Sequence, residues 1–172
     1  DGLGMALNQI SEDKIFVIVE DFFISKVIDE NIMKEVIHFS QSQNTQLIHF
    51  AKLPGSVESQ FPKYSKCNNG MPYLTSVCGI WDRKYMKSLL INGENAWQFE
   101  IYGSYRAQFS GDRIYCLKSP LFEFKNMVQK GAWVKSNVAW AKSLGIPLAF
   151  DGRPIQPSSL FYFKDFYFQL MW

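Results

Sequence analysis

Two adjacent carboxylates, Glu20 and Asp21, directly follow an apolar run from Ile15 to Val19. A continuous run of this kind, rich in β-branched residues, predicts a strand that is buried on both faces, as in a parallel sheet. Ligands of open α/β sheets bind beyond the carboxyl ends of the strands, where Asp21 would reach them. One or two carboxylates, together with substrate phosphates, are what a hard divalent cation requires. The alternative is that Asp21 begins an ordinary turn and that Glu20 lies on a solvated edge.

A second group of candidate residues lies in the stretch "NGENAWQFE". A helix from Glu94 to Tyr102 would place Trp97 and Ile101 on one face, with Glu100 at the edge of that face, about 60° from Trp97. A carboxylate beside an indole is partly desolvated, which raises its pKa and suits it to general-base catalysis. A purely structural role for Glu100 stays open. Glu94 falls in the first turn, where an acid complements the helix dipole.

The stretch "YGSYR" follows this predicted helix and supplies groups that bind polar ligands. It offers backbone N–H groups, the hydroxyl of Ser104 and the guanidinium of Arg106. The alternative is that Gly103 stops the helix and that Ser104 belongs to a plain turn. Three arginines are candidates for phosphate contact: Arg106, Arg113 and Arg153.

The elements that would position these residues alternate between helices and strands. The apolar spacing predicts helices over residues 3–10, 29–39, 83–91, 94–102 and 133–144, with Asp29 and Asp82 as N-caps. It predicts strands over residues 15–19, 46–51, 73–80 and 113–118, and a long loop from Pro54 to Pro72. This alternation indicates a single α/β domain over residues 1–172, with a mixed, mostly parallel sheet flanked by helices.

Composition narrows the classes of function. A net charge of +2 over 172 residues provides no field for nucleic acid, so we expect no nucleic-acid partner. Three widely spaced cysteines and two histidines favour neither a disulfide scaffold nor a zinc site. No apolar run is long enough to span a bilayer. The aromatic tail, residues 160–172, would dock on a membrane interface or on a second subunit as a homodimer, or pack back on its own domain.

Several motifs occur in one order: "EDFF" after the first strand, "GIWDRKYMKSLL" with "NGENAWQFE", then "GS" and "KGAW". This order, from about Leu7 to Arg153, resembles bacterial glycosyltransferases of the GT-A type that act in capsule and lipopolysaccharide synthesis. The resemblance implies a GT-A-like fold, a nucleotide-sugar donor, and a glycan or lipid-linked acceptor. It also implies a cytoplasmic location, at the inner face of the membrane.

The resemblance assigns roles to individual residues. Glu20 and Asp21 stand where the acidic motif of such enzymes binds a divalent metal (Mn or Mg) and the donor diphosphate, although the usual Asp-x-Asp spacing is absent. Glu100 looks like the base that deprotonates the acceptor hydroxyl. Trp97 looks like part of the acceptor platform, and Trp81 in "GIW" would lie near the donor sugar.

The resemblance also divides the chain. Residues 1–55 would be the end of the nucleotide-sugar-binding half, 56–150 the acceptor and catalytic half, and 151–172 the aromatic tail. We find no βαβ unit before the first strand, so we expect an incomplete donor site and a fragment of a longer enzyme.

Two other classes of function stay open. One is a metal-dependent phosphoesterase that uses Glu20, Asp21 and Asp151. The other is a non-catalytic module that binds glycan or protein through its aromatic residues. We expect His38 and His49 to be structural, because both have apolar neighbours in sequence.

Overall fold

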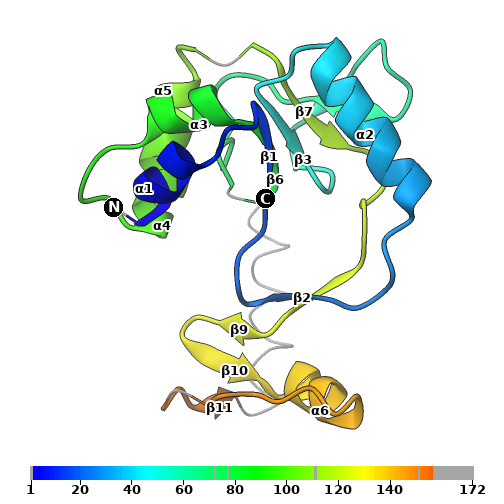
Figure 1. Cartoon of the computed structure of the whole chain (residues 1–172), viewed down its shortest axis with the longest axis vertical. Helices are drawn as coiled ribbons and strands as arrows, with labels where there is room; N and C mark the ends of the chain where they lie inside the picture. The colour runs from blue at the N-terminus through cyan, green and yellow to red at the C-terminus, as the bar shows by residue number, and fades with distance from the viewer. Residues whose placement is uncertain (1, 72, 77, 111, 151, 157–172) are drawn as a thin grey trace. The chain divides into compact units, whose positions relative to one another are not determined.

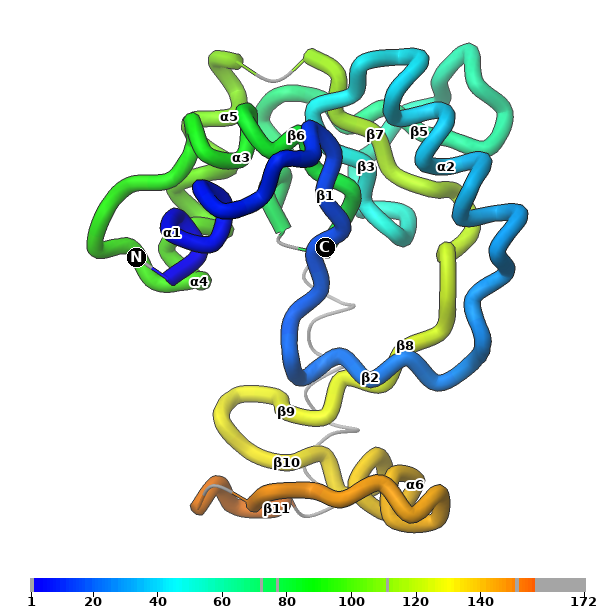
Figure 2. Tube along the Cα trace, in the orientation of Figure 1, coloured from blue at the N-terminus to red at the C-terminus, as the bar shows by residue number. Residues whose placement is uncertain are grey.

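The computed structural model describes residues 2–71, 73–76, 78–110, 112–150 and 152–156, and their contacts form two compact units (Figures 1 and 2). Unit 1 comprises residues 1–19 and 26–123, and unit 2 comprises residues 20–25 and 124–172. The chain therefore visits unit 2 twice, first as a short excursion that contains Glu20 and Asp21. The division expected near residues 55 and 150 stays a prediction, and residues 157–172 of the aromatic tail lie outside the described residues.

Among the described residues, six strands of unit 1 form one sheet in the order β1-β6-β3-β7-β5-β4. They are β1 (Lys14–Val17), β3 (Leu47–His49), β4 (Val57–Glu58), β5 (Tyr64–Lys66), β6 (Gly79–Asp82) and β7 (Ile114–Leu117). The pair β3 and β7 is parallel, whereas the other four pairs of this sheet are antiparallel. The predicted α/β fold with a mixed sheet is confirmed. The prediction of a mostly parallel sheet is wrong, because an apolar strand does not specify the direction of its neighbour.

The first strand differs from its prediction in a way that matters for function. Within the described part of the chain, β1 pairs with β6 alone, with Phe16 opposite Ile80 and Lys14 opposite Asp82. Ile15 is buried, whereas Phe16 is 41% exposed. β1 is therefore an edge strand with one well-covered face, and the expected strand buried on both faces is not found.

The sheet of unit 1 separates two hydrophobic cores. Leu47 and Trp81 point into the core beneath α1 (Gly2–Gln9) and α3 (Arg83–Leu89), whereas the neighbouring Ile48 and Ile80 point into the core beneath α2 (Glu30–Ser42). This is the two-residue periodicity of strands. Helices therefore cover both faces of the sheet (Figure 1).

Two helices begin at the predicted N-caps. A carboxylate oxygen of Asp29 accepts a hydrogen bond from the backbone N–H of Asn31 at 2.8 Å, at the start of α2. Asp82 accepts one from the N–H of Tyr85 at 2.8 Å, at the start of α3. Both predictions are confirmed, because a cap needs only residues within a few positions in sequence.

Other boundaries differ from the predicted ones. The strand expected over residues 73–80 is limited to β6, and the loop expected from Pro54 to Pro72 contains the strands β4 and β5. None of the helices in the described part of the chain is long and apolar enough to cross a bilayer.

Among its described residues, unit 2 combines short strands with one helix. Its elements are β2 (Phe22–Ile24), β8 (Phe124–Asn126), β9 (Val128–Gln129), β10 (Ala132–Val134), α6 (Lys135–Ser143) and β11 (Ile155–Gln156). β2 pairs antiparallel with β8, and the rings of Phe22 and Phe124 stack at 4.4 Å between centroids. Trp133 belongs to β10 and to a small core with Met127 and Val138, so the helix predicted from residue 133 begins two residues later.

Candidate functional site

The predicted site residues around Glu100 share one helical segment made of three parts. They are α4 (Ala96–Gln98), the π-helix η1 (Phe99–Gly103) and α5 (Ser104–Ala107). The segment begins at Asn95, whose side chain accepts from the N–H of Gln98 at 2.9 Å, while the Gln98 side chain accepts from the N–H of Asn95 at 2.9 Å. This capping box explains the start of the segment. A π-turn inside a helix is uncommon and is frequent at functional sites.

Buried hydroxyl groups hold the π-turn in place. The Thr75 hydroxyl donates to the carbonyl of Phe99 at 3.1 Å, and the Ser104 hydroxyl donates to the carbonyl of Glu100. The backbone N–H of Thr75 donates to the Ser104 hydroxyl at 3.0 Å. Thr75 and Ser104 are both buried. Ser104 therefore positions the backbone of Glu100, and its hydroxyl is already engaged inside the protein.

Gly103 is required by close packing in the same place. A Cβ atom at this position would lie 2.9 Å from Oγ1 of Thr75 and 3.3 Å from the ring of Phe99. The helix continues through Gly103 to Ala107, so the helix stop predicted at Gly103 is wrong. The backbone is helical there, and a small residue is needed for contact with Thr75.

The outer side of the segment carries a row of exposed apolar and aromatic side chains, which we call the aromatic ridge. Its members recur every four residues and are Trp97 (73% exposed), Ile101 (59%), Tyr105 (62%) and Phe109 (77%). The rings of Tyr105 and Phe109 meet edge to face with centroids 5.4 Å apart. An exposed apolar row of this length marks an interaction surface.

Glu100 lies beside the aromatic ridge. It precedes Ile101 and follows Trp97 by three residues, and it is half-buried. The π-turn and the hydroxyls of Thr75 and Ser104 fix its backbone. The structure thus brings Glu100, Trp97, Gly103 and Ser104 together on one rigid segment. The raised pKa expected for Glu100 stays a prediction.

Arg106 and Glu94 form an internal clamp between the two ends of the segment. The guanidinium of Arg106 donates to both carboxylate oxygens of Glu94, at 2.8 and 2.6 Å, and to the backbone carbonyl of Leu89 at 2.9 Å. A bidentate pair of this geometry is among the stronger side-chain interactions. The guanidinium of Arg106 already bonds to groups of the same chain. Arg106 therefore stabilises the segment and is not available to bind a phosphate. Glu94 accepts both hydrogen bonds of this ion pair, whereas the N-cap of α4 is Asn95.

Trp81 lies wholly within the core, with none of its side chain exposed. Its ring is 6.2 Å from that of Phe99, between centroids. It therefore supports the π-turn from below, and it has no surface to offer to a donor sugar.

Glu20 and Asp21 belong to unit 2, where they form a turn just before β2. Glu20 is exposed, and burial raises the pKa of Asp21, with a further contribution from the charge of Glu20, whereas Arg153 opposes the shift. No group of three or more potential metal-ligating side chains occurs among the described residues. Asp151, expected with them in a phosphoesterase, lies outside the described residues.

His49 is structural, as expected. It is buried, and its Nε2 atom lies 3.0 Å from the carbonyl oxygen of Leu74. Burial lowers its pKa to about 4.

Sequence reasoning missed Tyr105, Phe109 and Thr75. The signal for the first two was present, since the four-residue spacing from Trp97 continues beyond Gly103. No local pattern points to Thr75, which reaches the segment from 24 residues upstream of Phe99.

Comparison of the chain with family models, with curated proteins and with solved structures finds no match. The class that the fold and the site define is therefore an α/β protein with an exposed aromatic ridge beside a half-buried carboxylate.

Proposed function

We propose that the chain is a glycosyltransferase, or part of one, which transfers a sugar from a nucleotide-sugar donor to a glycan or lipid-linked acceptor. The observation that carries the proposal is the placement of Glu100 on a rigid π-turn beside the aromatic ridge. The order of motifs that resembles bacterial GT-A glycosyltransferases supports it. The same resemblance implies that the reaction belongs to surface polysaccharide synthesis, at the cytoplasmic face of the membrane.

In this proposal the aromatic ridge binds the acceptor. Indole and phenol rings provide flat apolar faces with a polar edge, which suit the C–H faces of sugars at a wet surface. Of the aromatic members of the ridge, Trp97 is nearest in sequence to Glu100, and it takes the sugar whose hydroxyl reacts. Tyr105 and Phe109 extend the contact along the acceptor.

Glu100 is the proposed general base. Its carboxylate takes the proton of the acceptor hydroxyl as the acceptor oxygen forms a bond to the anomeric carbon of the donor. The bond between that carbon and the diphosphate oxygen breaks, and the nucleoside diphosphate leaves with the bonding electrons. The acceptor and the base must therefore meet at the aromatic ridge, where Glu100 is held by its backbone.

A divalent metal does not enter this mechanism. The described residues offer Glu20 and Asp21 alone at the expected acidic motif, without the spacing of two carboxylates that would face one ion. A raised pKa and the nearby Arg153 both make Asp21 a weaker ligand. These residues do not fit a metal centre, and we assign no step to a metal.

The first test is calorimetric titration of the chain with a panel of nucleotide diphosphate sugars, with and without manganese, followed by a transfer assay with the donor that binds. We expect Glu100→Gln to lower the transfer rate by about 10²–10⁴-fold and to leave donor affinity unchanged. Glu30→Gln, on the exposed start of α2, is the matched control.

Other outcomes of this test would support other classes. If the chain binds glycan but transfers no sugar, and if the Glu100→Gln variant binds glycan equally well, the chain is a binding module. The aromatic ridge alone would be sufficient for that function. Hydrolysis of a generic phosphoester would instead support the phosphoesterase.

A further inference from the structure

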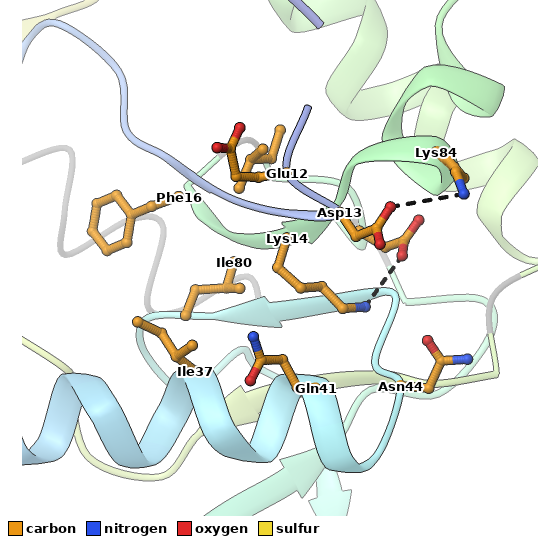
Figure 3. A pocket seen from close by; sticks show the side chains of 11 residues that line it. Glu12, Asp13, Lys14, Phe16, Ile37, Gln41, Asn44, Ile80 and Lys84 are labelled. Atoms are coloured by element: carbon orange, nitrogen blue, oxygen red, sulfur yellow. Dashed lines mark hydrogen bonds and ion pairs between the residues drawn. The ribbon is translucent and has the colours of Figure 1, made fainter. Parts of the chain in front are cut away.

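A hollow of unit 1 lies between the edge strand β1 and helix α2 (Figure 3). Its volume is about 650 Å³, inside the range of about 300–1,000 Å³ typical of small-molecule sites. It exists because α2 turns Val36 into the core and leaves Ile37 39% exposed, while Phe16 on β1 is 41% exposed. We call it the β1–α2 pocket.

One end of the β1–α2 pocket is apolar. Phe16, Ile37 and Ile80 lie there together in Figure 3. The Phe16 ring stacks on Phe50 with centroids 4.5 Å apart, which holds it in one orientation. The pocket therefore offers a fixed aromatic ring next to two aliphatic side chains, a surface suited to a flat ligand with an apolar face.

The other end is polar and carries side-chain amides. Gln41 and Asn44 line it from the C-terminal end of α2 (Figure 3). Both are exposed, and neither side-chain amide has a hydrogen-bond partner in the described part of the chain. Each amide can donate two hydrogen bonds and accept two. These groups are available to a ligand that both donates and accepts.

Four of the five charged side chains that line the pocket form two ion pairs. The ammonium group of Lys14 is 3.2 Å from a carboxylate oxygen of Asp82 and also binds the carbonyl of Thr45, and Lys84 is 3.7 Å from Asp13. Glu12 adds a third carboxylate against two ammonium groups. The side chains that line the pocket therefore carry no excess of positive charge to attract a phosphate, and the ligand that fits it is neutral and polar.

We propose that the β1–α2 pocket binds a neutral pyranose sugar. One face of a pyranose ring is made of C–H groups and fits Phe16, while its hydroxyls donate and accept and fit the free amides of Gln41 and Asn44. The site is separate from the aromatic ridge, which is built on α4, η1 and α5. The proposal does not depend on the proposed transfer reaction.

The test is titration of the ¹⁵N-labelled chain with methyl glycopyranosides of glucose, galactose and N-acetylglucosamine, followed by amide chemical shifts. A ligand with about a dozen heavy atoms and ordinary ligand efficiency has a dissociation constant on the order of 1 mM. We expect at least one glycoside to shift amides of β1 and of the C-terminal half of α2.

Variants separate this pocket from general surface binding. Gln41→Ala should weaken binding by about fivefold, the worth of one hydrogen bond. Gln43→Ala, an exposed glutamine two positions further along that does not line the pocket, should leave it unchanged. Phe16→Leu keeps an apolar side chain for Phe50 and should weaken binding further by removing the ring.

The proposal is overturned if tens of millimolar glycoside leave the amides of β1 and α2 unshifted. It is also overturned if Gln41→Ala and Gln43→Ala bind equally, or if a nucleoside shifts these amides and no glycoside does. Shifts confined to residues 96–109 would overturn this site and would instead support acceptor binding on the aromatic ridge, so the two proposals can fail separately.

Discussion

Replacing Gly103 by alanine tests whether the π-turn is held by close packing. The added methyl group would lie 2.9 Å from Oγ1 of Thr75 and 3.3 Å from carbons of the Phe99 ring. Both neighbours are fixed, because Thr75 is fully buried and bonded to the segment, and Phe99 belongs to the core. The methyl group therefore forces either the hydroxyl or the helix to shift.

Two opposing terms set the size of the effect. Overpacking a well-packed core typically costs about 1–3 kcal/mol of unfolding free energy. Alanine in place of glycine inside a helix gains about 1 kcal/mol. The difference between the two terms is about 0–2 kcal/mol, so we expect Gly103→Ala to lower the free energy of unfolding by up to about 2 kcal/mol.

Gly4→Ala is the matched control, because Gly4 lies in α1 and a Cβ atom there meets nothing within 4 Å. Without a clash the helix gain stands alone, and we expect stabilisation by about 0.5–1 kcal/mol. A third variant, Thr75→Ala, removes the hydroxyl that the methyl group meets. In that background Gly103→Ala should cost about 1 kcal/mol less, as expected for two residues in contact.

The assay is urea denaturation, with amide hydrogen exchange of residues 96–107 to report local opening of the segment. Exchange there should speed up in Gly103→Ala and stay unchanged in Gly4→Ala. If Gly103→Ala stabilised the protein as much as Gly4→Ala does, the packing argument would be refuted, and with it the view that the π-turn holds Glu100 rigidly.

The remaining predictions concern charge. His49 binds its proton with a pKa of about 4 in the folded chain and about 6.5 when unfolded, so stability is full above pH 6.5 and falls by roughly 3 kcal/mol as the pH drops to 4. His49→Gln should remove that part of the pH dependence of urea midpoints, whereas His38→Gln should retain it; equal slopes would contradict the assignment. Arg106→Lys loses the bidentate contact with Glu94 and should cost roughly 2 kcal/mol in the same assay. Arg113→Lys, more exposed, should change stability by less than about 0.5 kcal/mol, and similar losses in both would argue against the clamp.

Features that depend on neighbours in sequence were predictable. The caps at Asp29 and Asp82 follow from a polar side chain placed before a helical apolar pattern, and both form as expected. The strand over residues 113–118 was found for the same kind of reason, since a short continuous apolar run is enough to identify β7. The helical grouping of Trp97 and Glu100 also needed only local spacing.

Features that depend on distant partners were not predictable. The apolar run of β1 is compatible with a central parallel strand or with an antiparallel edge, and its pairing with β6 alone, among the residues that the structure describes, makes it an edge. Gly103 has the sequence context of a helix stop, but Thr75 packs against it and the helix continues. Trp81 was expected at the donor sugar and is instead covered on all sides.

The amino-acid order alone was sufficient to establish the α/β class, the helix caps and the residues that share the segment around Glu100. These properties rest on hydrogen bonds and spacings within a few residues, which each stretch of chain carries in itself. The directions of the strands, the exposure of the aromatic ridge and the pairing of Arg106 with Glu94 were set by folding. The burial of a side chain and its pairing with a distant residue both depend on two parts of the chain that come into contact during folding. The identity of one residue therefore cannot specify them without its partner.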